Sequence, residues 1–324
     1  KFNIKRKGII KGMMQKRRLG KNGPELTVLG IGTWSMGGPW RHGWGAVDDQ
    51  ESIRTVQQAL ADGVNWIDTA PSYGLGHAEE ITGQALKGRR EQVYIATKCG
   101  IVWNSKGRPR HDLNPGSIRQ EVEASLRRLQ TDRIDLYQIH WPDPDVMEEK
   151  AWRELVSLQR QGKVRWLGVS NFDVQKLQAC EAVHHIDSLQ PPYHLLRRDI
   201  ETEIMPFCEQ HGIGIVAYSP LASGLLSGHF DIRNVAADDW RLQNEMFQGE
   251  RLQHNLRIAE KLKAIADELN TSVAALAIAF VLRKPQVTSA IVGSRRVAQW
   301  QEAVAAATLR CDETIWRRME QWTE

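Results

Sequence analysis

The sequence has few of the features that mark several other protein classes. Its 324 residues include only four cysteines, widely spaced, with no Cys-x-x-Cys pair and no histidine at zinc-site spacing. No stretch approaches the roughly 18 apolar residues of a membrane span. The segment Gly30-Ile31-Gly32 precedes Thr33 and Trp34, so no Gly-x-Gly-x-x-Gly motif forms. These absences argue against a disulfide-rich secreted protein, a metal site, a membrane protein and a Rossmann dehydrogenase. They favour a cytoplasmic protein.

The net charge is small and unevenly distributed. The chain has 43 Lys and Arg against 39 Asp and Glu, which gives +4. Removing the five basic residues that precede Met14 changes this to −1, so we expect no nucleic acid and no anionic membrane as a partner. Residues 1–13 are interpreted as an upstream extension or a cloning remnant, with translation starting at Met13 or Met14. Residues 14–324 are interpreted as one domain.

Short apolar segments rich in β-branched residues alternate with segments of helical periodicity eight times along the chain. The expected strands are 29–34, 65–68, 93–98, 134–140, 164–170, 188–190, 214–219 and 289–293. The expected helices are 48–62, 78–87, 115–129, 148–161, 174–183, 201–211, 255–268, 272–282 and 297–307. Eight such repeats predict an α/β fold of the (β/α)8 TIM-barrel type rather than an open sheet.

Further segments extend this predicted barrel. Residues 100–114 and 221–254 form long loops after the third and seventh strands, at the end where barrel enzymes build their sites. Residues 17–20 and 26–29, around Asn22-Gly23, predict an N-terminal β-hairpin that closes the opposite end. Residues 312–322 predict a C-terminal helix on the side of the barrel.

Four ionisable side chains lie at or just beyond the ends of successive predicted strands. Asp68 ends the second strand, with Tyr73 five residues later, Lys98 ends the third and His140 the fourth. Carboxyl ends of parallel strands meet at one mouth, so we expect these side chains to converge. Each residue alone is better explained by ion pairing, packing or capping. Their joint placement favours catalysis.

This set of residues is suited to proton transfer beside a carbonyl group. A lysine cation favours phenolate, so Lys98 is expected to lower the pKa of Tyr73, with Asp68 anchoring the lysine. Tyr73 and His140 would hold a carbonyl oxygen while Tyr73 protonates it. No side chain supplies hydride, so this chemistry needs a nicotinamide cofactor.

Five segments resemble the aldo-keto reductases, in particular the bacterial NADPH-dependent type. They are 63–74 (GVNWIDTAPSYG), 95–98 (IATK), 135–142 (DLYQIHWP), 162–172 (GKVRWLGVSNF) and 217–221 (AYSPL). Their order, spacing and strand-end positions are similar to that family's from about residue 17 to residue 307. The resemblance implies a barrel enzyme that reduces aldehydes and ketones to alcohols with NADPH. It implies Asp68, Tyr73, Lys98 and His140 as the catalytic tetrad, with Tyr73 as the general acid.

The same matching implies a groove for NADPH or NADP+. Its residues at the barrel mouth and in the loop after the seventh strand would be Thr33, Trp34, Asp68, Ser170, Asn171, Gln190, Tyr218, Ser219, Pro220, Leu221, Gly224 and Leu226. Tyr218 resembles the aromatic residue that stacks on the nicotinamide. At the adenosine end the residues would be Gly293, Ser294, Arg295, Gln299 and Glu302, with Arg295 clamping the 2′-phosphate. Ala303 stands where many family members carry Asn, so one of the contacts to the adenine would be missing.

The substrate side is less specific. Trp34, Tyr73, His140 and Trp141 are expected to line a pocket for a small carbonyl compound. Arg41, Arg108 and Arg110 lie in nearby loops, where they either meet an anionic substrate or face water. Self-association cannot be read from the sequence.

Two other functions remain open. One is a regulatory or redox-sensing subunit that binds the cofactor on the same barrel. The other is a lyase or isomerase on a phosphate-binding barrel, which leaves Tyr218 and the Ser170-Asn171 pair unexplained.

Overall fold

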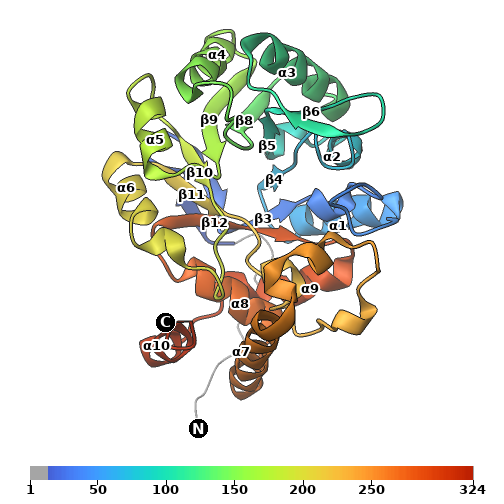
Figure 1. Cartoon of the computed structure of the whole chain (residues 1–324), viewed down its shortest axis with the longest axis vertical. Helices are drawn as coiled ribbons and strands as arrows, with labels where there is room; N and C mark the ends of the chain where they lie inside the picture. The colour runs from blue at the N-terminus through green and yellow to red at the C-terminus, as the bar shows by residue number, and fades with distance from the viewer. Residues whose placement is uncertain (1–13, 324) are drawn as a thin grey trace.

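The computed structural model describes residues 14–323, and the interpretation of residues 1–13 lies outside this range. Eight parallel strands form a closed barrel (Figure 1). They are β3 (Leu29–Gly32), β4 (Trp66–Asp68), β5 (Tyr94–Cys99), β8 (Ile134–Ile139), β9 (Val164–Ser170), β10 (Ser188–Gln190), β11 (Gly214–Ala217) and β12 (Val287–Gly293). Each strand pairs with the next along the chain, and β12 closes the barrel on β3. The predicted TIM-barrel fold is confirmed.

Helices surround the barrel. They are α1 (Asp49–Ala61), α2 (His77–Ala85), α3 (Pro115–Leu129), α4 (Glu148–Arg160), α5 (Val174–Glu181), α6 (Ile204–His211), α7 (Gly249–Glu268), α8 (Val273–Leu282), α9 (Val297–Val304) and α10 (Glu313–Glu320). Asp48, Asp173 and Ser272 cap α1, α5 and α8, each accepting a hydrogen bond from a backbone N–H of the first turn. The short 3-10 helices are η1 (Trp34–Met36), η2 (Arg90–Gln92), η3 (Asp199–Glu201), η4 (Ala222–Gly224), η5 (Ile232–Asn234), η6 (Trp240–Gln243), η7 (Glu245–Phe247) and η8 (Ala305–Ala307).

An N-terminal hairpin closes the end of the barrel where the strands begin. Its strands are β1 (Lys16–Arg18) and β2 (Glu25–Thr27). Leu19 and Leu26 pack into the barrel interior beside Trp66, whose Nε1 donates to Thr27 O at 3.2 Å. The predicted hairpin therefore exists, but its strands end earlier than expected. Leu19 N donates to Pro24 O and Gly23 N donates to Leu19 O, both at 2.9 Å, so residues 19–24 form the turn.

Two segments at the other end differ from the prediction. The expected loop 100–114 contains an antiparallel hairpin of β6 (Ile101–Trp103) and β7 (Pro109–His111). Asn104 turns this hairpin, since its Oδ1 accepts from Lys106 N at 2.9 Å and Arg108 N at 3.1 Å. Helix α7 starts six residues before the predicted position 255. Buried Asn255 faces the core there and donates to Met246 O at 2.9 Å, so a polar residue interrupts the apolar periodicity that sequence reasoning uses.

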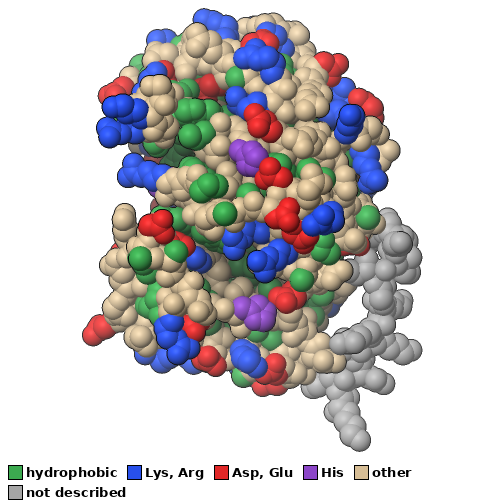
Figure 2. Space-filling view, turned by 90° about the vertical axis from the view of Figure 1, so that its right-hand side faces the viewer, with side chains coloured by type: hydrophobic (Ala, Val, Ile, Leu, Met, Phe, Trp, Pro, Cys, Tyr) green, Lys and Arg blue, Asp and Glu red, His purple; other side chains and the backbone are tan. Residues whose placement is uncertain are grey.

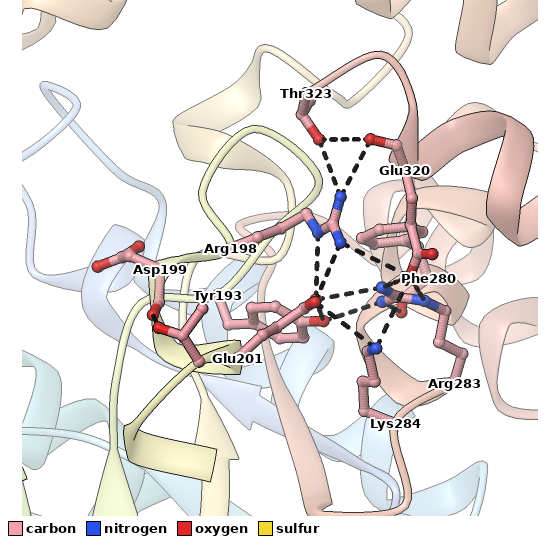
Figure 3. Close-up of polar contacts among 10 residues, drawn as sticks. Tyr193, Arg198, Asp199, Glu201, Phe280, Arg283, Lys284, Glu320 and Thr323 are labelled. Carbon is pink, nitrogen blue, oxygen red and sulfur yellow. Dashed lines mark hydrogen bonds and ion pairs between the residues drawn. The ribbon is translucent and has the colours of Figure 1, made fainter. Parts of the chain in front are cut away.

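The C-terminal helix α10 packs against α8, as the expected cover on the barrel side. The rings of Trp316 and Phe280 lie 6.2 Å apart. An ion-pair network joins the same elements (Figure 3), in which Arg283 pairs with Glu320 and, at 3.2 Å, with Glu201. Tyr193, Arg198, Lys284 and Thr323 complete the network.

Charge and apolar composition agree with the sequence analysis. Figure 2, which shows the side of the molecule that is on the right in Figure 1, has acidic and basic side chains interspersed over that face. Within residues 14–323, no single helix has both the length and the apolar composition to cross a membrane. Helices α7 and α8 meet that test only as a pair, and they are bent by 97° at their junction.

Candidate active site

Asp68, Lys98 and Tyr73 form a connected group at the base of the barrel mouth. Asp68 ends β4 and Lys98 lies near the end of β5, so two neighbouring parallel strands bring them together. Lys98 Nζ donates to both carboxylate oxygens of Asp68, at 2.7 and 2.9 Å, and to Thr69 O at 2.9 Å. It also donates to the Tyr73 hydroxyl at 3.1 Å. The Lys98 side chain is fully buried, so the pair is shielded from bulk water.

Burial controls the protonation of this group. It lowers the pKa of Lys98, and the Asp68 carboxylate partly offsets that change. Burial and the Asp68 charge raise the pKa of Tyr73 well above its usual range. The expectation that Lys98 would lower the pKa of Tyr73 is therefore wrong for this arrangement, because desolvation of a phenolate and repulsion by Asp68 outweigh the lysine. Tyr73 is a neutral phenol near pH 7 and has a proton to donate.

His140 lies directly beyond β8 and faces Tyr73. The two ring centroids are 5.7 Å apart with the planes at 78°, and Ser72 Oγ is 3.5 Å from His140 Nδ1. Burial, with the charges of Lys98 and His111, lowers the pKa of His140 well below its usual value. A neutral imidazole has one N–H donor and one acceptor nitrogen. His140 can therefore donate one hydrogen bond to an oxygen held beside the Tyr73 hydroxyl.

A close backbone contact sets the position of Tyr73. Gly74 has φ +63°, and a Cβ at this residue would lie 1.9 Å from Gly37 O. A Cβ on Gly37 would in turn lie 2.7 Å from Gly74 N. Only glycine allows this approach without displacing one of the two segments. The contact holds Tyr73 beneath the loop between β3 and α1.

The first of two cavities at the mouth has a volume of about 440 Å³. Most of the residues predicted for the cofactor at the barrel mouth and in the loop after the seventh strand line it: Trp34, Asp68, Ser170, Asn171, Gln190, Tyr218, Ser219 and Pro220. Gly293, predicted for the adenosine end, lines it too. Tyr218 OH donates to Asn171 Oδ1 at 2.8 Å, and Gln190 Nε2 donates to Asp68 Oδ2 at 2.8 Å. Asn171 Nδ2 donates to His140 O at 3.0 Å. These bonds connect the cavity wall to the buried group at its base.

The residues predicted for the adenosine end follow β12. Arg295 donates from its side chain to Trp44 O at 3.0 Å and lies 5.6 Å from the centre of the Trp44 ring. Its backbone N–H donates to Gln299 Oε1 at 2.9 Å. Ser294 is buried, and its Oγ has no hydrogen-bond partner among the described residues. Glu302 instead pairs with His229 at 3.2 Å. The side chains of Arg295, Gln299 and Glu302 thus have protein partners in this structure.

Several predicted residues support the groove without lining it. Thr33 Oγ1 donates to Asp68 O at 3.2 Å. Leu226 is fully buried. Gly224, with φ +104°, turns the chain after β11, and its N–H donates to Leu221 O at 3.0 Å. Ala303, which departs from the family pattern, is buried and presents no polar group.

Sequence reasoning missed several residues that line the first cavity. They are Gly32, Trp44, Pro192, His194, Arg197, Ala222, Ser223, Trp240, Asn244, Met246 and Ile291. Trp44 and Trp240 come from separate loops and both pack edge-on against Trp34, with ring centroids at 5.1 and 5.8 Å. Their tryptophan identity and their place in loops at the mouth were the available signal. Nothing in the sequence indicated that the two loops meet.

The second cavity has a volume of about 660 Å³ and shares Tyr73 and His140 with the first. Trp34, Tyr73, His140 and Trp141 line it, as expected for the substrate side. They are joined by residues of the β3–α1 loop and the β6–β7 hairpin, including Trp40, Arg41, His42, Trp103, Arg110 and His111. Arg108 is exposed and does not line it. Tyr73 and His140 therefore lie where the two cavities meet.

The sequence profile of the Aldo/keto reductase family matches residues 28–324. The chain belongs to the aldo/keto reductase family. No group of three or more His, Cys, Asp or Glu side chains within residues 14–323 is arranged to hold a metal ion.

The names of relatives within the family indicate different activities. The chain is 38% identical over 290 residues to "Aldo-keto reductase YhdN" of Bacillus subtilis, covering 88% of this chain and 86% of the relative. It is 35% identical over 329 residues to the "NADH-specific methylglyoxal reductase" of Escherichia coli, covering 96% and 100%. It is 34% identical over 306 residues to the "Probable voltage-gated potassium channel subunit beta" of Arabidopsis thaliana, covering 90% and 91%.

Solved structures of family members superpose closely on this barrel. The glycerol dehydrogenase AKR11B4 from Gluconobacter oxydans has a TM-score of 0.86 and 35% identity, with 95% of each chain covered. An aldo/keto reductase from Klebsiella pneumoniae in complex with NADP and acetate has a TM-score of 0.74 and 28% identity, with 95% of each chain covered.

Proposed function

We propose that the protein is an NADPH-dependent reductase of aldehydes and ketones, with Tyr73 as the general acid. The observation that carries this proposal is the buried chain from Asp68 through Lys98 to the Tyr73 hydroxyl, which ends where the two cavities meet. A proton donor at that junction can reach a carbonyl group in one cavity that faces a nicotinamide in the other.

Each side chain of this group has a distinct part in the proposed reaction. Tyr73 and His140 donate hydrogen bonds to the carbonyl oxygen and so stabilise the negative charge that develops on it. Tyr73 then transfers its proton to that oxygen. The Lys98 cation, 3.1 Å from the phenol oxygen, stabilises the phenolate that remains, and Asp68 keeps Lys98 in place. The high pKa of Tyr73 keeps the acid protonated until charge builds up on the substrate oxygen.

The first cavity fits a nicotinamide cofactor, which supplies hydride when bound. The ring of Tyr218 forms part of its wall, beside Asn171 and Gln190, which carry amide groups that can bind a carboxamide. The buried Ser294 Oγ, which has no partner within residues 14–323, is a free hydrogen-bonding group at the adenosine end. The NADP complex of the Klebsiella relative supports the same cofactor here.

The preference for NADPH over NADH rests on Arg295. A guanidinium binds a phosphate with two parallel hydrogen bonds and also stacks on flat rings. Arg295 lies at the end of β12, beside the start of α9, and burial with the charges of Arg296 and Arg241 lowers its pKa. Arg241 is already paired with Asp239 at 2.6 Å, so Arg295 and Arg296 are the cations that favour a bound dianion. The relative from Escherichia coli is named as NADH-specific, so the cofactor preference has to be measured for this chain.

A second candidate function is a subunit that binds the cofactor and reports its redox state to a partner. The similarity to the channel β-subunit of Arabidopsis thaliana favours it. This function predicts cofactor binding with very slow turnover. The free thiols of all four cysteines support a cytoplasmic location for either function.

The deciding experiment measures NADPH oxidation with an activated aromatic aldehyde and cofactor binding by tryptophan fluorescence. We expect wild type to turn over, and Tyr73→Phe to lose at least about a hundredfold in kcat while binding NADPH as before. Cofactor binding without turnover in wild type would favour the sensor. No cofactor binding would refute both functions.

A further inference from the structure

The second cavity has an unusual charge composition. Its 16 lining residues include two arginines, Arg41 and Arg110, and three histidines, but no Asp or Glu within residues 14–323. The rest of the wall is mainly aromatic or aliphatic, with the indoles of Trp34, Trp40 and Trp103 among its members. A pocket with apolar walls and positive charge at one side is suited to a ligand that carries an anionic group on an apolar body.

Arg41 is the uncompensated cation of this wall. Arg110 pairs with Asp112 at 2.8 Å, which neutralises much of its charge. Arg41 has no ion pair among the described residues. Burial and the charge of Arg41 lower the pKa of His42, so this imidazole is neutral at pH 7. The charge of Arg41 is therefore available to a ligand in the cavity.

We propose that the preferred substrates are aldehydes or ketones that carry a carboxylate or phosphate on a flat apolar body, with Arg41 pairing with the anion. This inference rests on the proposed function. The carbonyl group lies at Tyr73 and His140, the body packs on the tryptophans, and the anion meets Arg41 and, less strongly, Arg110. The volume of about 660 Å³ is far larger than a three-carbon substrate needs and accommodates such a body.

The effect on catalysis should be on binding rather than on the chemical step. Arg41 is exposed to solvent, so its contact with an anion is weaker than a buried charge-assisted hydrogen bond. Removing it should raise KM for the anionic substrate and leave kcat nearly unchanged. Added salt should reduce the advantage of the anionic substrate, because the charge of an exposed side chain is screened.

The test compares matched anionic and neutral substrates. The first pair is 4-carboxybenzaldehyde and methyl 4-formylbenzoate, and the second is 4-formylphenyl phosphate and 4-methoxybenzaldehyde. Wild type, Arg41→Gln and Arg110→Gln are assayed, with Arg108→Gln as the control. Arg108 lies in the turn of the β6–β7 hairpin, near Arg110, and is exposed as Arg41 and Arg110 are, but it does not line the cavity. The ratio of kcat/KM between the members of a pair, divided by the same ratio in wild type, cancels their different intrinsic reactivity.

We expect Arg41→Gln to lower this normalised ratio about three- to tenfold through KM. Arg110→Gln should lower it less, and Arg108→Gln should leave it unchanged. Loss in the first pair alone identifies a carboxylate as the preferred anion, and loss in the second pair alone identifies a phosphate. Unchanged ratios in Arg41→Gln and Arg110→Gln would overturn the inference while the reductase function stands. A decrease in Arg108→Gln equal to that in Arg41→Gln would do the same. No turnover of any of the four aldehydes in wild type would instead count against the proposed function.

Discussion

Replacing Lys98 with Met tests whether the buried ion pair at the barrel mouth is held by mutual compensation. Lys98 Nζ makes four contacts of 2.7 to 3.1 Å, two of them to Asp68. Without the lysine, Asp68 keeps a side-chain hydrogen bond only from Gln190 Nε2 among the described residues, at 2.8 Å. A buried charge that loses its partner costs about 3 to 5 kcal/mol of unfolding free energy. We expect a loss in this range for Lys98→Met.

The double variant Lys98→Met/Asp68→Asn separates the ion pair from its packing. It removes both charges while keeping similar side-chain volumes, so the uncompensated carboxylate is gone. We expect it to be more stable than Lys98→Met alone, within about 2 kcal/mol of wild type. The destabilisation of the single variant should also depend on pH. A buried carboxylate without its cation takes up a proton more readily in the folded state than in the unfolded chain. Folded Lys98→Met then binds the extra proton, so its stability falls as pH rises, and the loss is larger at pH 8 than at pH 5.

Denaturant unfolding at both pH values measures these differences. Lys176→Met is the control, because Lys176 pairs with Asp173 at 2.7 Å on the surface, and its loss should cost less than about 1 kcal/mol. The reasoning is refuted if Lys98→Met is no more destabilising than Lys176→Met. It is also refuted if adding Asp68→Asn to Lys98→Met restores no stability. In either case the barrel mouth would tolerate an unpaired carboxylate.

Three further changes have distinct expected outcomes. Arg295→Ala should weaken NADPH binding by about 1 to 3 kcal/mol with little effect on NADH, measured by fluorescence titration; equal losses would exclude Arg295 as the phosphate clamp. Gly74→Ala should destabilise the fold by at least about 2 kcal/mol in a thermal unfolding assay, because its Cβ would lie 1.9 Å from Gly37 O. The control is Gly88→Ala, which also has a positive φ but open space around the new Cβ, and it should cost about 1 kcal/mol in the same assay. Burial raises the pKa of Glu201, but hydrogen bonds and nearby arginine charges outweigh this and lower the pKa to about 2. The contribution of the ionised Glu201 to folding stability is therefore complete above pH 4.5 and is lost as pH falls toward 2. The stability difference between wild type and Glu201→Gln should shrink by about 1 to 2 kcal/mol over that range.

The barrel was predictable because its signal is local and repeated. Short segments such as 134–139 and 164–170 are apolar enough to be buried strands, and amphipathic helices follow them at regular intervals. Parallel strands also place their carboxyl ends together, so Asp68 and Lys98 could be assigned to one mouth from their positions alone. Their direct contact in the structure follows from this register.

Protonation could not be predicted in the same way. The expected effect of Lys98 on Tyr73 considered one charge and omitted the environment. Burial of the phenol and the Asp68 charge act in the opposite direction and are larger. Both depend on how completely the surrounding chain excludes water. A sequence lists neighbours along the chain, whereas desolvation depends on neighbours in space.

For the same reason, the contacts between the loops that line the two cavities could not be predicted from the sequence. Trp44 and Trp240 are almost 200 positions apart, yet both pack on Trp34. Arg295 bonds to Trp44 O, and Arg241 lies 5.0 Å from the centre of the same ring, so three loops meet at one indole. The loop that carries Trp44 also contributes Arg41 to the second cavity. An arginine proposed to bind cofactor is thus in direct contact with the loop proposed to bind the substrate anion. If both proposals hold, substitution of Trp44 should alter cofactor affinity and substrate selectivity together, whereas Arg108, outside both cavities, should alter neither.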